Sequence, residues 1–309
     1  AAGGLANCQV VQVKSGPQGI VELATLAQLV DGDTAAFMMT NPNTLGLFES
    51  EMPRIAELLH SKGALLYCDG ANFNSLMGIA RPGDMGVDVM QFNLHKTFST
   101  PHGGGGPGSG PVGVSKTLEP YLPIPIVDKD GALFRAVTDR PLTIGRMKAF
   151  YGNFGIMLRA FTYISELGAE GLKKATECAV LNANYILARL RDDFHVPYDR
   201  GCMHECVFTD RKQLEFGVST LDIAKRLMDH GFHPPTIYFP LVVHGALMIE
   251  PTETESRESI DEFVAALKAI AAEARSNPAT VKGAPTLTPV GRVDEVGAAK
   301  NPRLVCTLK

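Results

Sequence analysis

The chain has 309 residues, of which 45% are hydrophobic and 20% are charged, with a formal net charge of −4 at pH 7. This length accommodates two domains and a sizeable core, and the weakly acidic balance argues against nucleic-acid binding, which needs a basic surface. No run approaches the ~18 apolar residues of a membrane span, and we expect no signal peptide before Ala1. Because the chain does not begin with methionine, we expect a fragment or a processed product that lacks an N-terminal part of its fold.

The six cysteines are scattered along the chain and form no dense disulfide framework. This pattern favours a reducing compartment over secretion. Cys202, His204 and Cys206 would share one face of an extended segment and could be drawn as a metal cluster. Because no second ligand pair follows at the spacing of a zinc finger, we expect a half-buried strand and no metal site.

The N-terminal part alternates short apolar runs with segments of helical periodicity. The expected strands are residues 7–13, 35–39, 65–68 and 87–92, and the expected helices are residues 20–30 and 51–60. Pro53 falls in the first turn of the second helix, where a missing N–H costs nothing. Strands that alternate with helices predict an α/β fold with βαβ units and a mostly parallel sheet.

After Pro141 the helical segments become longer. Here the expected helices are residues 156–167, 172–190, 221–230 and 259–274, and the expected strands are residues 205–208, 236–239 and 246–249. This mixture predicts a smaller α+β domain, and we place the boundary inside the long helical stretch, between a domain of residues 1–177 and one of residues 178–309. The proline-containing tail after Asn277 is expected to be extended.

Polar residues follow three of the predicted strands at the point where each strand ends. Thr40 and Asn41 follow the first, Asp69 ends the second, and Lys96 lies just after the third. In a parallel sheet the carboxyl ends of the strands meet at one edge, which is where ligands bind. The sequence therefore predicts that these side chains form one site.

Lys96 and Asp69 suggest the chemistry of a pyridoxal cofactor. A lysine that forms a Schiff base needs a desolvated position, and the apolar strand before Lys96 and the glycines after it would provide one. A carboxylate such as that of Asp69 keeps the ring nitrogen of pyridoxal protonated, so that the ring accepts electrons. The alternatives are an ordinary surface lysine and an aspartate that caps a helix or forms a turn.

The segments TNPNTLG and DGAN add amide and hydroxyl groups to the predicted site. Thr40, Asn41 and Asn72 would contact the phenolic oxygen of the cofactor or the substrate carboxylate, and Asn43 is a candidate for substrate binding. The alternative for these residues is a strand-to-helix turn, for which Asn-Pro and glycine are common. Thr97, next to the lysine, is a further candidate for cofactor binding.

A glycine-dense loop follows the lysine. Gly103, Gly105 and Gly108 match G-x-G-x-x-G, but Gly110-Pro111-Val112 leads into a strand and not into a helix, so we reject a dinucleotide-binding motif. Close packing of backbone beside the lysine is the preferred role of the loop. His95, a candidate catalytic residue, and His102, a candidate for substrate binding, would either contact cofactor or substrate or bind the backbone of this loop.

Long motifs resemble a known family. They are TNPNTLGLFE, YCDGAN, RPGDMGVDVMQFNLHKTFSTPHGGGGPGSGPVGV, LNANYILARL, DIAKRLMDHGFHPPTIYFP and LMIEPTETES. They closely resemble the pyridoxal-phosphate subunit of glycine decarboxylase, the P-protein of the glycine cleavage system, in its C-terminal half or second subunit. The resemblance covers nearly the whole chain.

The resemblance implies the large domain of a fold-type-I pyridoxal 5′-phosphate (PLP) enzyme, related to aspartate aminotransferase, in partial form. It implies that Lys96 carries the cofactor and that Asp69 pairs with the ring nitrogen. Glycine would lose its carboxylate as carbon dioxide, and the aminomethyl group would pass to the lipoyl arm of the H-protein. The expected partners also include a homologous first subunit or half-chain in an oligomer, in the bacterial cytoplasm or the mitochondrial matrix.

The family has further N-terminal sequence, which supplies the residue that stacks on the pyridine ring and much of the phosphate cradle. Two other functions stay open from the sequence. One is a different fold-type-I decarboxylase or aminotransferase, with Arg257 or Arg200 binding the substrate carboxylate. The other is a non-catalytic scaffold paralogue, against which the presence of both Lys96 and Asp69 argues.

Overall fold

The computed structural model describes residues 2–102, 106, 108–149 and 151–305. The chain forms two compact units, the first of residues 1–181 with 202–204 and the second of residues 182–201 with 205–309. The domain boundary expected between residues 177 and 178 stays a prediction. Within the described residues, no helix is both long enough and apolar enough to cross a membrane.

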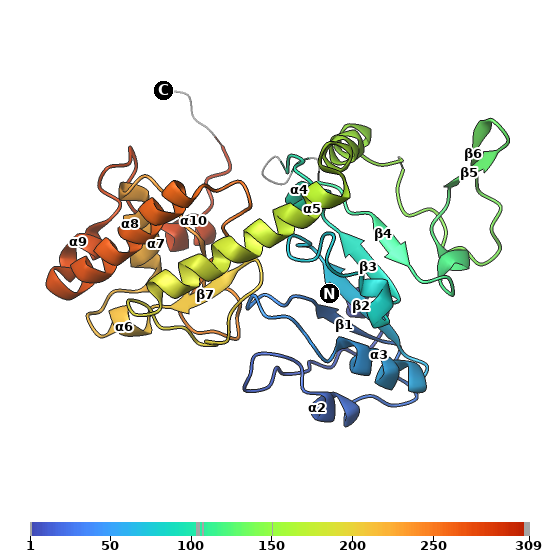
Figure 1. The fold of residues 1–309 in the computed structure, drawn as a ribbon, viewed down its shortest axis with the longest axis horizontal. Coiled ribbons are helices and arrows are strands. Elements are labelled where there is room, and N and C mark those ends of the chain that lie inside the picture. The colour runs from blue at the N-terminus through green and yellow to red at the C-terminus, as the bar shows by residue number, and fades with distance from the viewer. Residues whose placement is uncertain (1, 103–105, 107, 150, 306–309) are drawn as a thin grey trace. The chain divides into compact units, whose positions relative to one another are not determined.

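The first unit is built on a mostly parallel sheet, as predicted. Its strands are β1 (Ala36–Thr40), β2 (Leu65–Gly70), β3 (Val89–Phe92) and β4 (Val112–Val114), in that spatial order (Figure 1). The first three strands are parallel and β4 is antiparallel to β3. The apolar runs predicted as the second, third and fourth strands correspond to β1, β2 and β3, because each run is bounded by turn residues.

One face of this sheet forms the core of the first unit. Met39, Leu66, Cys68 and Met90 are buried on it and pack with α2 (Leu23–Ala27) and α3 (Met52–Ser61). The buried residues of α3 recur at helical spacing, and a proline occupies its first turn, as expected. Burial raises the pKa of the Cys68 thiol to about 11, so this cysteine is a neutral member of the core.

One prediction for the first unit was wrong, and one hairpin was missed. Residues 7–13 form no strand; Val10 and Val11 are both exposed, so their alternation does not correspond to a buried and an exposed face. The hairpin of β5 (Ile126–Asp130) and β6 (Leu133–Val137) was not predicted; nearly all of its residues are exposed, including the apolar ones, so it has no buried face. The remaining short elements are α1 (Ala2–Leu5), η1 (Pro82–Met85), α4 (Leu94–Thr97) and η2 (Glu119–Tyr121).

The long helix α5 (Phe154–Leu190) contributes its first part to the first unit and its last residues to the second. Its backbone leaves the helical conformation at Gly168, where φ is 60°. A positive φ is readily adopted by glycine alone among common residues, so the break falls there. The two helices predicted on either side of this point are thereby confirmed.

The second unit combines an antiparallel sheet with helices. Its strands are ordered β7 (Cys206–Thr209), β9 (Ala246–Ile249) and β8 (Thr236–Ile237), and its helices are α6 (Arg211–Leu214), α7 (Thr220–Asp229), α8 (Arg257–Ser276), α9 (Pro278–Gly283) and α10 (Glu295–Lys300). Ser219 and Asp222 form a capping box at the start of α7, which satisfies two backbone N–H groups. The α+β composition agrees with the prediction.

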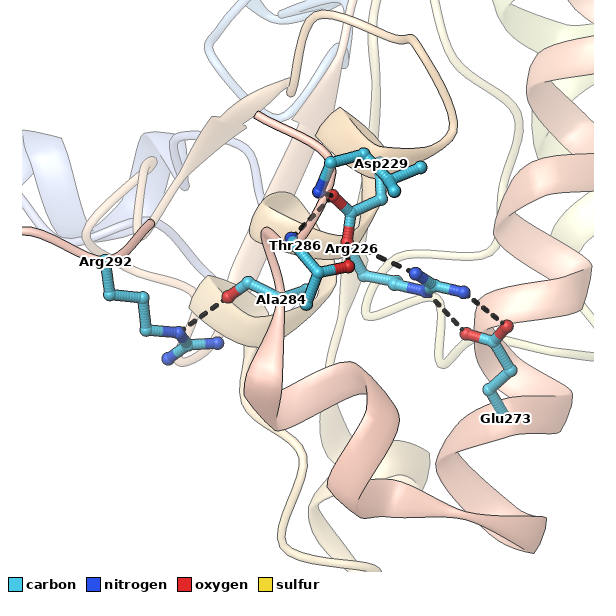
Figure 2. A network of polar contacts seen from close by, with 7 residues as sticks. Arg226, Asp229, Glu273, Ala284, Thr286 and Arg292 are labelled. Carbon is cyan, nitrogen blue, oxygen red and sulfur yellow. Dashed lines mark hydrogen bonds and ion pairs between the residues drawn. The ribbon is translucent and has the colours of Figure 1, made fainter. Parts of the chain in front are cut away.

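The tail after Asn277 is more ordered than predicted, because it contains α9 and α10. Polar contacts fasten it to α7 (Figure 2). Asp229 accepts hydrogen bonds from the N–H groups of Thr286 and Leu287, both at 2.8 Å, and from Arg226 at 3.2 Å. Arg226 also makes two 2.8 Å bonds to Glu273 of α8.

Arg292 provides a second attachment of the tail. Its Nε donates to the carbonyl oxygen of Ala284, and its Nη2 donates to Asp222, each at 2.7 Å (Figure 2 draws the first). A proline-rich sequence therefore stays close to α7 because charged side chains hold its backbone.

Candidate active site

Three residues form a row at the carboxyl edge of the sheet. Thr40 of β1 pairs in register with Asp69 of β2, and Asp69 pairs in register with Gln91 of β3. Residues paired in this way lie ~4.8 Å apart across strands and project from the same face. This face lies opposite the apolar core, so the structure brings Thr40 and Asp69 together as the sequence predicts.

Asp69 uses only one of its carboxylate oxygens. Oδ1 accepts hydrogen bonds from Gln91 Nε2 at 2.6 Å and from the N–H of Ala71 at 2.9 Å. Oδ2 accepts none from the residues that the structure describes, and the side chain is half-buried. A carboxylate that is fixed through one oxygen presents the other to a ligand.

Gly70 explains how β2 and β3 approach each other beside Asp69. A Cβ atom at this position would lie 2.3 Å from the carbonyl oxygen of Gln91 and 2.3 Å from Met90 Cε. Since real side chains do not tolerate such contacts, only glycine fits after the aspartate. Asp69 thus provides the carboxylate, and Gly70 allows β2 and β3 to lie close together beside it.

Lys96 lies on α4, which begins two residues after β3 ends. Its Nζ makes no hydrogen bond or ion pair with any described residue, and the residue is exposed. The expectation of a desolvated lysine is therefore wrong for this chain. The short connection between β3 and α4 places the lysine at the sheet edge, but the described residues do not bury it.

Thr97 and Asn72 connect the segments that follow β2 and β3. Thr97 is buried, and its Oγ1 accepts a 2.9 Å hydrogen bond from the N–H of Phe73. Asn72 Oδ1 accepts a 3.1 Å bond from the N–H of Asn74. These contacts tie the loop after Asp69 to the helix of Lys96, and the predicted contacts of Thr97 and Asn72 with cofactor stay predictions.

His95 binds the backbone of the glycine-rich loop. Its Nδ1 accepts a 3.2 Å hydrogen bond from the N–H of Ser109, which places the proton of the neutral ring on Nε2. The ring centroid lies 5.0 Å from that of His102, and a Cβ at Gly108 would lie 3.2 Å from the ring. Close packing of this loop on His95 is thus present at Gly108; Gly103 and Gly105 lie outside the described residues.

Asn41 and Asn43 shape the loop after β1. Asn41 is buried, accepts a 3.0 Å bond from the N–H of Glu49 and donates to Glu49 O at 3.4 Å. Asn43 donates to Gly19 O at 2.9 Å and to Glu49 Oε1 at 2.8 Å, and its Oδ1 accepts from two backbone N–H groups. These contacts favour the turn alternative, and the predicted contacts with cofactor or substrate stay predictions.

Gln91 and Tyr67 were not singled out from the sequence. Tyr67 OH donates to Gln91 Oε1 at 2.7 Å, and Gln91 in turn donates to Asp69. The one available sequence signal was a glutamine inside the apolar run VDVMQF, one residue before the strand ends. Its relation to Asp69 depends on the register of β2 and β3, which the sequence does not give.

Comparison with known families agrees with this geometry. Residues 3–105 match the family model described as aminotransferase class-V. Residues 175–284 match the model described as glycine dehydrogenase, C-terminal domain. The first match contains Thr40, Asp69 and Lys96, so the row at the sheet edge falls in the part that resembles an aminotransferase.

Relatives cover nearly the whole chain. A protein of Chlorobium chlorochromatii named "Probable glycine dehydrogenase (decarboxylating) subunit 2" is 56% identical over 307 residues, which are 99% of this chain and 64% of the relative. A protein of the same name from Halalkalibacterium halodurans is 57% identical over 300 residues, 97% of this chain and 62% of the relative.

Over nearly its whole length, the chain is therefore similar to proteins named glycine dehydrogenase (decarboxylating) subunit 2. This similarity confirms the resemblance predicted from the motifs, and PLP, the predicted cofactor, is the cofactor of class-V aminotransferases and glycine decarboxylases. The chain spans less than two thirds of the length of these relatives.

Solved structures show the same fold. Glycine decarboxylase (P-protein) of the glycine cleavage system, in inhibitor-bound form, matches with a TM-score of 0.73 and 21% identity, over 86% of this chain and 60% of that one. The cysteine desulfurase CsdA of Escherichia coli matches with a TM-score of 0.68 and 16% identity, over 88% and 67% of the two chains. The prediction of a fold-type-I PLP transferase fold is confirmed.

Proposed function

We propose that this chain supplies the lysine and the ring-nitrogen carboxylate of a glycine decarboxylase. The observation that supports this proposal most directly is the pairing of Asp69 and Lys96 at one sheet edge. Asp69 has an oxygen without a partner, and Lys96 has an ammonium group without a partner, among the described residues. Both groups are at the carboxyl ends of parallel strands, where α/β proteins bind ligands.

The residues at this edge fit PLP. Lys96 Nζ would hold the cofactor covalently, Asp69 Oδ2 would accept the N–H of the pyridine ring, and Thr40 offers a hydroxyl group on the neighbouring strand. When bound, PLP supplies an electron-accepting ring that weakens the bond to the carboxylate of glycine. Asp69 would keep the ring nitrogen protonated, and the loop contacts of Thr97 and Phe73 would hold Asp69 and Lys96 in register.

The exposure of Lys96 indicates that groups beyond the described residues complete the site. A catalytic lysine works best away from water. The relatives are longer than this chain, which spans 62–64% of the two compared above. We therefore place the missing cover, the ring-stacking residue and much of the phosphate cradle in further sequence of the subunit or in a partner subunit.

The partners follow from the same proposal. Glycine is the substrate, and the lipoyl arm of the H-protein receives the aminomethyl group. A first subunit, or the homologous half of a fused chain, completes the oligomer, in keeping with the name "subunit 2" of the relatives. For localisation we propose the cytoplasm of a bacterium, since these relatives are bacterial, or the mitochondrial matrix in a eukaryote.

The test is release of labelled carbon dioxide from carboxyl-labelled glycine by the full-length subunit with its partner subunit. Release should require lipoylated H-protein, and Lys96→Ala should lower it about a thousandfold or more. Lys116→Ala removes an exposed lysine of the same unit and should have no effect. Release that does not need the H-protein would point to another PLP decarboxylase, and no release from the parent protein would point to a scaffold.

A further inference from the structure

Asp69 is held from the side by two residues that lie on the same face of the sheet. Tyr67 and Asp69 are two residues apart on β2, so their side chains project from one face. Gln91 pairs in register with Asp69, and Val89 pairs with Tyr67. Tyr67, Gln91 and Asp69 therefore form a continuous polar line on rigid strands.

The hydrogen bonds fix the orientation of the Gln91 amide. Tyr67 OH donates to Gln91 Oε1 at 2.7 Å, so the amide oxygen is the acceptor and Nε2 is left to donate to Asp69. Burial, followed by the charge of Asp69, raises the pKa of Tyr67, so Tyr67 remains a hydroxyl donor at neutral pH. If the amide rotated by half a turn, its oxygen would face a carboxylate oxygen, which is repulsive.

The same bonds determine which oxygen of Asp69 a ligand can reach. Oδ1 already accepts from Gln91 at 2.6 Å and from Ala71 at 2.9 Å. With two donors on Oδ1, the carboxylate cannot rotate without losing both bonds, each of which is a charge-assisted hydrogen bond. Oδ2 is therefore the oxygen that faces an incoming N–H donor.

We propose that Gln91, oriented by Tyr67, is a positioning residue that sets the Asp69 carboxylate for the ring nitrogen of PLP. This inference rests on the proposed function, because it assigns Asp69 to the pyridine ring. Gln91 acts through Asp69 and not on the substrate. Tyr67 acts through Gln91 and is one hydrogen bond further from Asp69, so its contribution to the orientation of the carboxylate is smaller.

The test uses the full-length protein loaded with PLP labelled with ¹⁵N in the ring. The ¹⁵N chemical shift of the ring nitrogen reports its proton and its hydrogen bond, which a residue with a merely structural role would not change. Asp69→Asn gives the reference value for a nitrogen without a carboxylate partner. Gln91→Leu and Gln91→Glu remove the donor to Asp69 at similar size, and Tyr67→Phe removes one hydroxyl group.

We expect the Gln91 variants to shift the ¹⁵N signal toward the Asp69→Asn value and to weaken PLP binding about tenfold or more, as for loss of a hydrogen bond to a charged group. Tyr67→Phe should shift the ¹⁵N signal in the same direction and weaken PLP binding by about threefold. Val112→Ala alters the exposed neighbour of Gln91 on β4 and should change neither.

A wild-type ¹⁵N signal and wild-type PLP affinity in both Gln91 variants would overturn the proposal. If those variants do not fold, Tyr67→Phe decides, and an unchanged signal in it overturns the proposal. Borohydride reduction distinguishes a failure of the Gln91 proposal from a failure of the proposed function. An adduct at Lys96 with no effect of Gln91 refutes only this inference, whereas the absence of an adduct in the parent protein refutes the proposed function.

Discussion

Asp69 in the first unit and Asp229 in the second are both held by backbone N–H groups and a polar side chain, but they differ in what remains free. Asp229 uses both oxygens, because Oδ1 accepts from Thr286 and Leu287 while Oδ2 accepts from Arg226 and Thr286. Asp69 uses Oδ1 only. The side chain of Asp229 is 1% exposed, whereas Asp69 is half-buried at the edge of a sheet.

This difference separates a structural carboxylate from one that is prepared for a ligand. Thr286 and Leu287 of the tail and Arg226 of α7 together occupy both oxygens of Asp229, and the bonds from Thr286 and Leu287 fasten the tail to α7 (Figure 2), so we expect its loss to lower stability. Asp69 is oriented but not saturated, so we expect its loss to lower activity. Four predictions test that contrast.

The largest effect is expected for Asp69→Ala. Without the carboxylate, the ring nitrogen of PLP loses the partner that keeps it protonated, so decarboxylation of glycine should fall about a thousandfold or more. Lys96 should still be modified by the cofactor, and the free energy of unfolding should change by only ~1 kcal/mol. Carbon dioxide release and urea unfolding measure the two quantities, and undiminished turnover would make Asp69 a turn residue.

Asp229→Ala should have the opposite profile. It removes the acceptor for two backbone N–H groups and for Arg226, which should lower the free energy of unfolding by roughly 2–3 kcal/mol in urea titrations. Glu262→Ala removes an exposed carboxylate of α8 and serves as the control, with an expected change within ~0.5 kcal/mol. Equal stability of the two variants would show that the tail contact is not stabilising.

Low pH should lower the stability of the second unit by protonating Asp229 and Glu273, the two carboxylates that bind Arg226. Burial alone would raise the pKa of Asp229, but the N–H groups of Leu287 and Thr286 and the Arg226 guanidinium outweigh it and hold this pKa below its usual range. The bonds from Arg226 lower the pKa of Glu273 as well. Stability from such groups is present above the unfolded pKa values of ~4 and is lost as pH falls through the folded values.

Urea unfolding measured from pH 7 down to pH 3 should therefore show a free energy of unfolding that falls below pH ~4. Asp229→Asn has no carboxylate to take up a proton at this position, so its stability should depend less on pH over the same range. A variant that follows the wild-type curve in parallel would exclude Asp229 as a source of the acid sensitivity.

The smallest effect is expected for Arg226→Lys. Lysine keeps the positive charge but cannot make the two parallel bonds to Glu273. Since the pair is partly exposed, the free energy of unfolding should fall by about 1 kcal/mol, with no change in PLP binding. Thermal unfolding of the variant beside Arg257→Lys, whose ion pair with Asp261 is long and exposed, checks this expectation.

The sequence predicted the elements that have strong local patterns. The apolar runs before Asn41, Asp69 and Asn93 became β1, β2 and β3, since turn residues end each of them. The break of α5 at Gly168 also fell between two predicted helices. Thr40, Asp69 and Lys96 could thus be assigned to one sheet edge before their neighbours were known.

What the sequence did not predict depends on contacts between distant segments. Gln91 meets Asp69 only through the register of two strands, and no local pattern encodes that register. Asn41 and Asn43 carry the same amide groups as a ligand site would, but Glu49 and the loop backbone bind them. The exposure of Lys96 reflects which groups cover it, a property that local sequence does not contain.

The central claim, that Lys96 carries the cofactor, is tested most directly by borohydride reduction of the PLP-loaded full-length protein and peptide mapping by mass spectrometry. We predict a single pyridoxyl adduct on the peptide that contains Lys96, present in Asp69→Ala and Lys116→Ala and absent in Lys96→Ala. An adduct on another lysine, or none in the wild-type protein, would contradict the account.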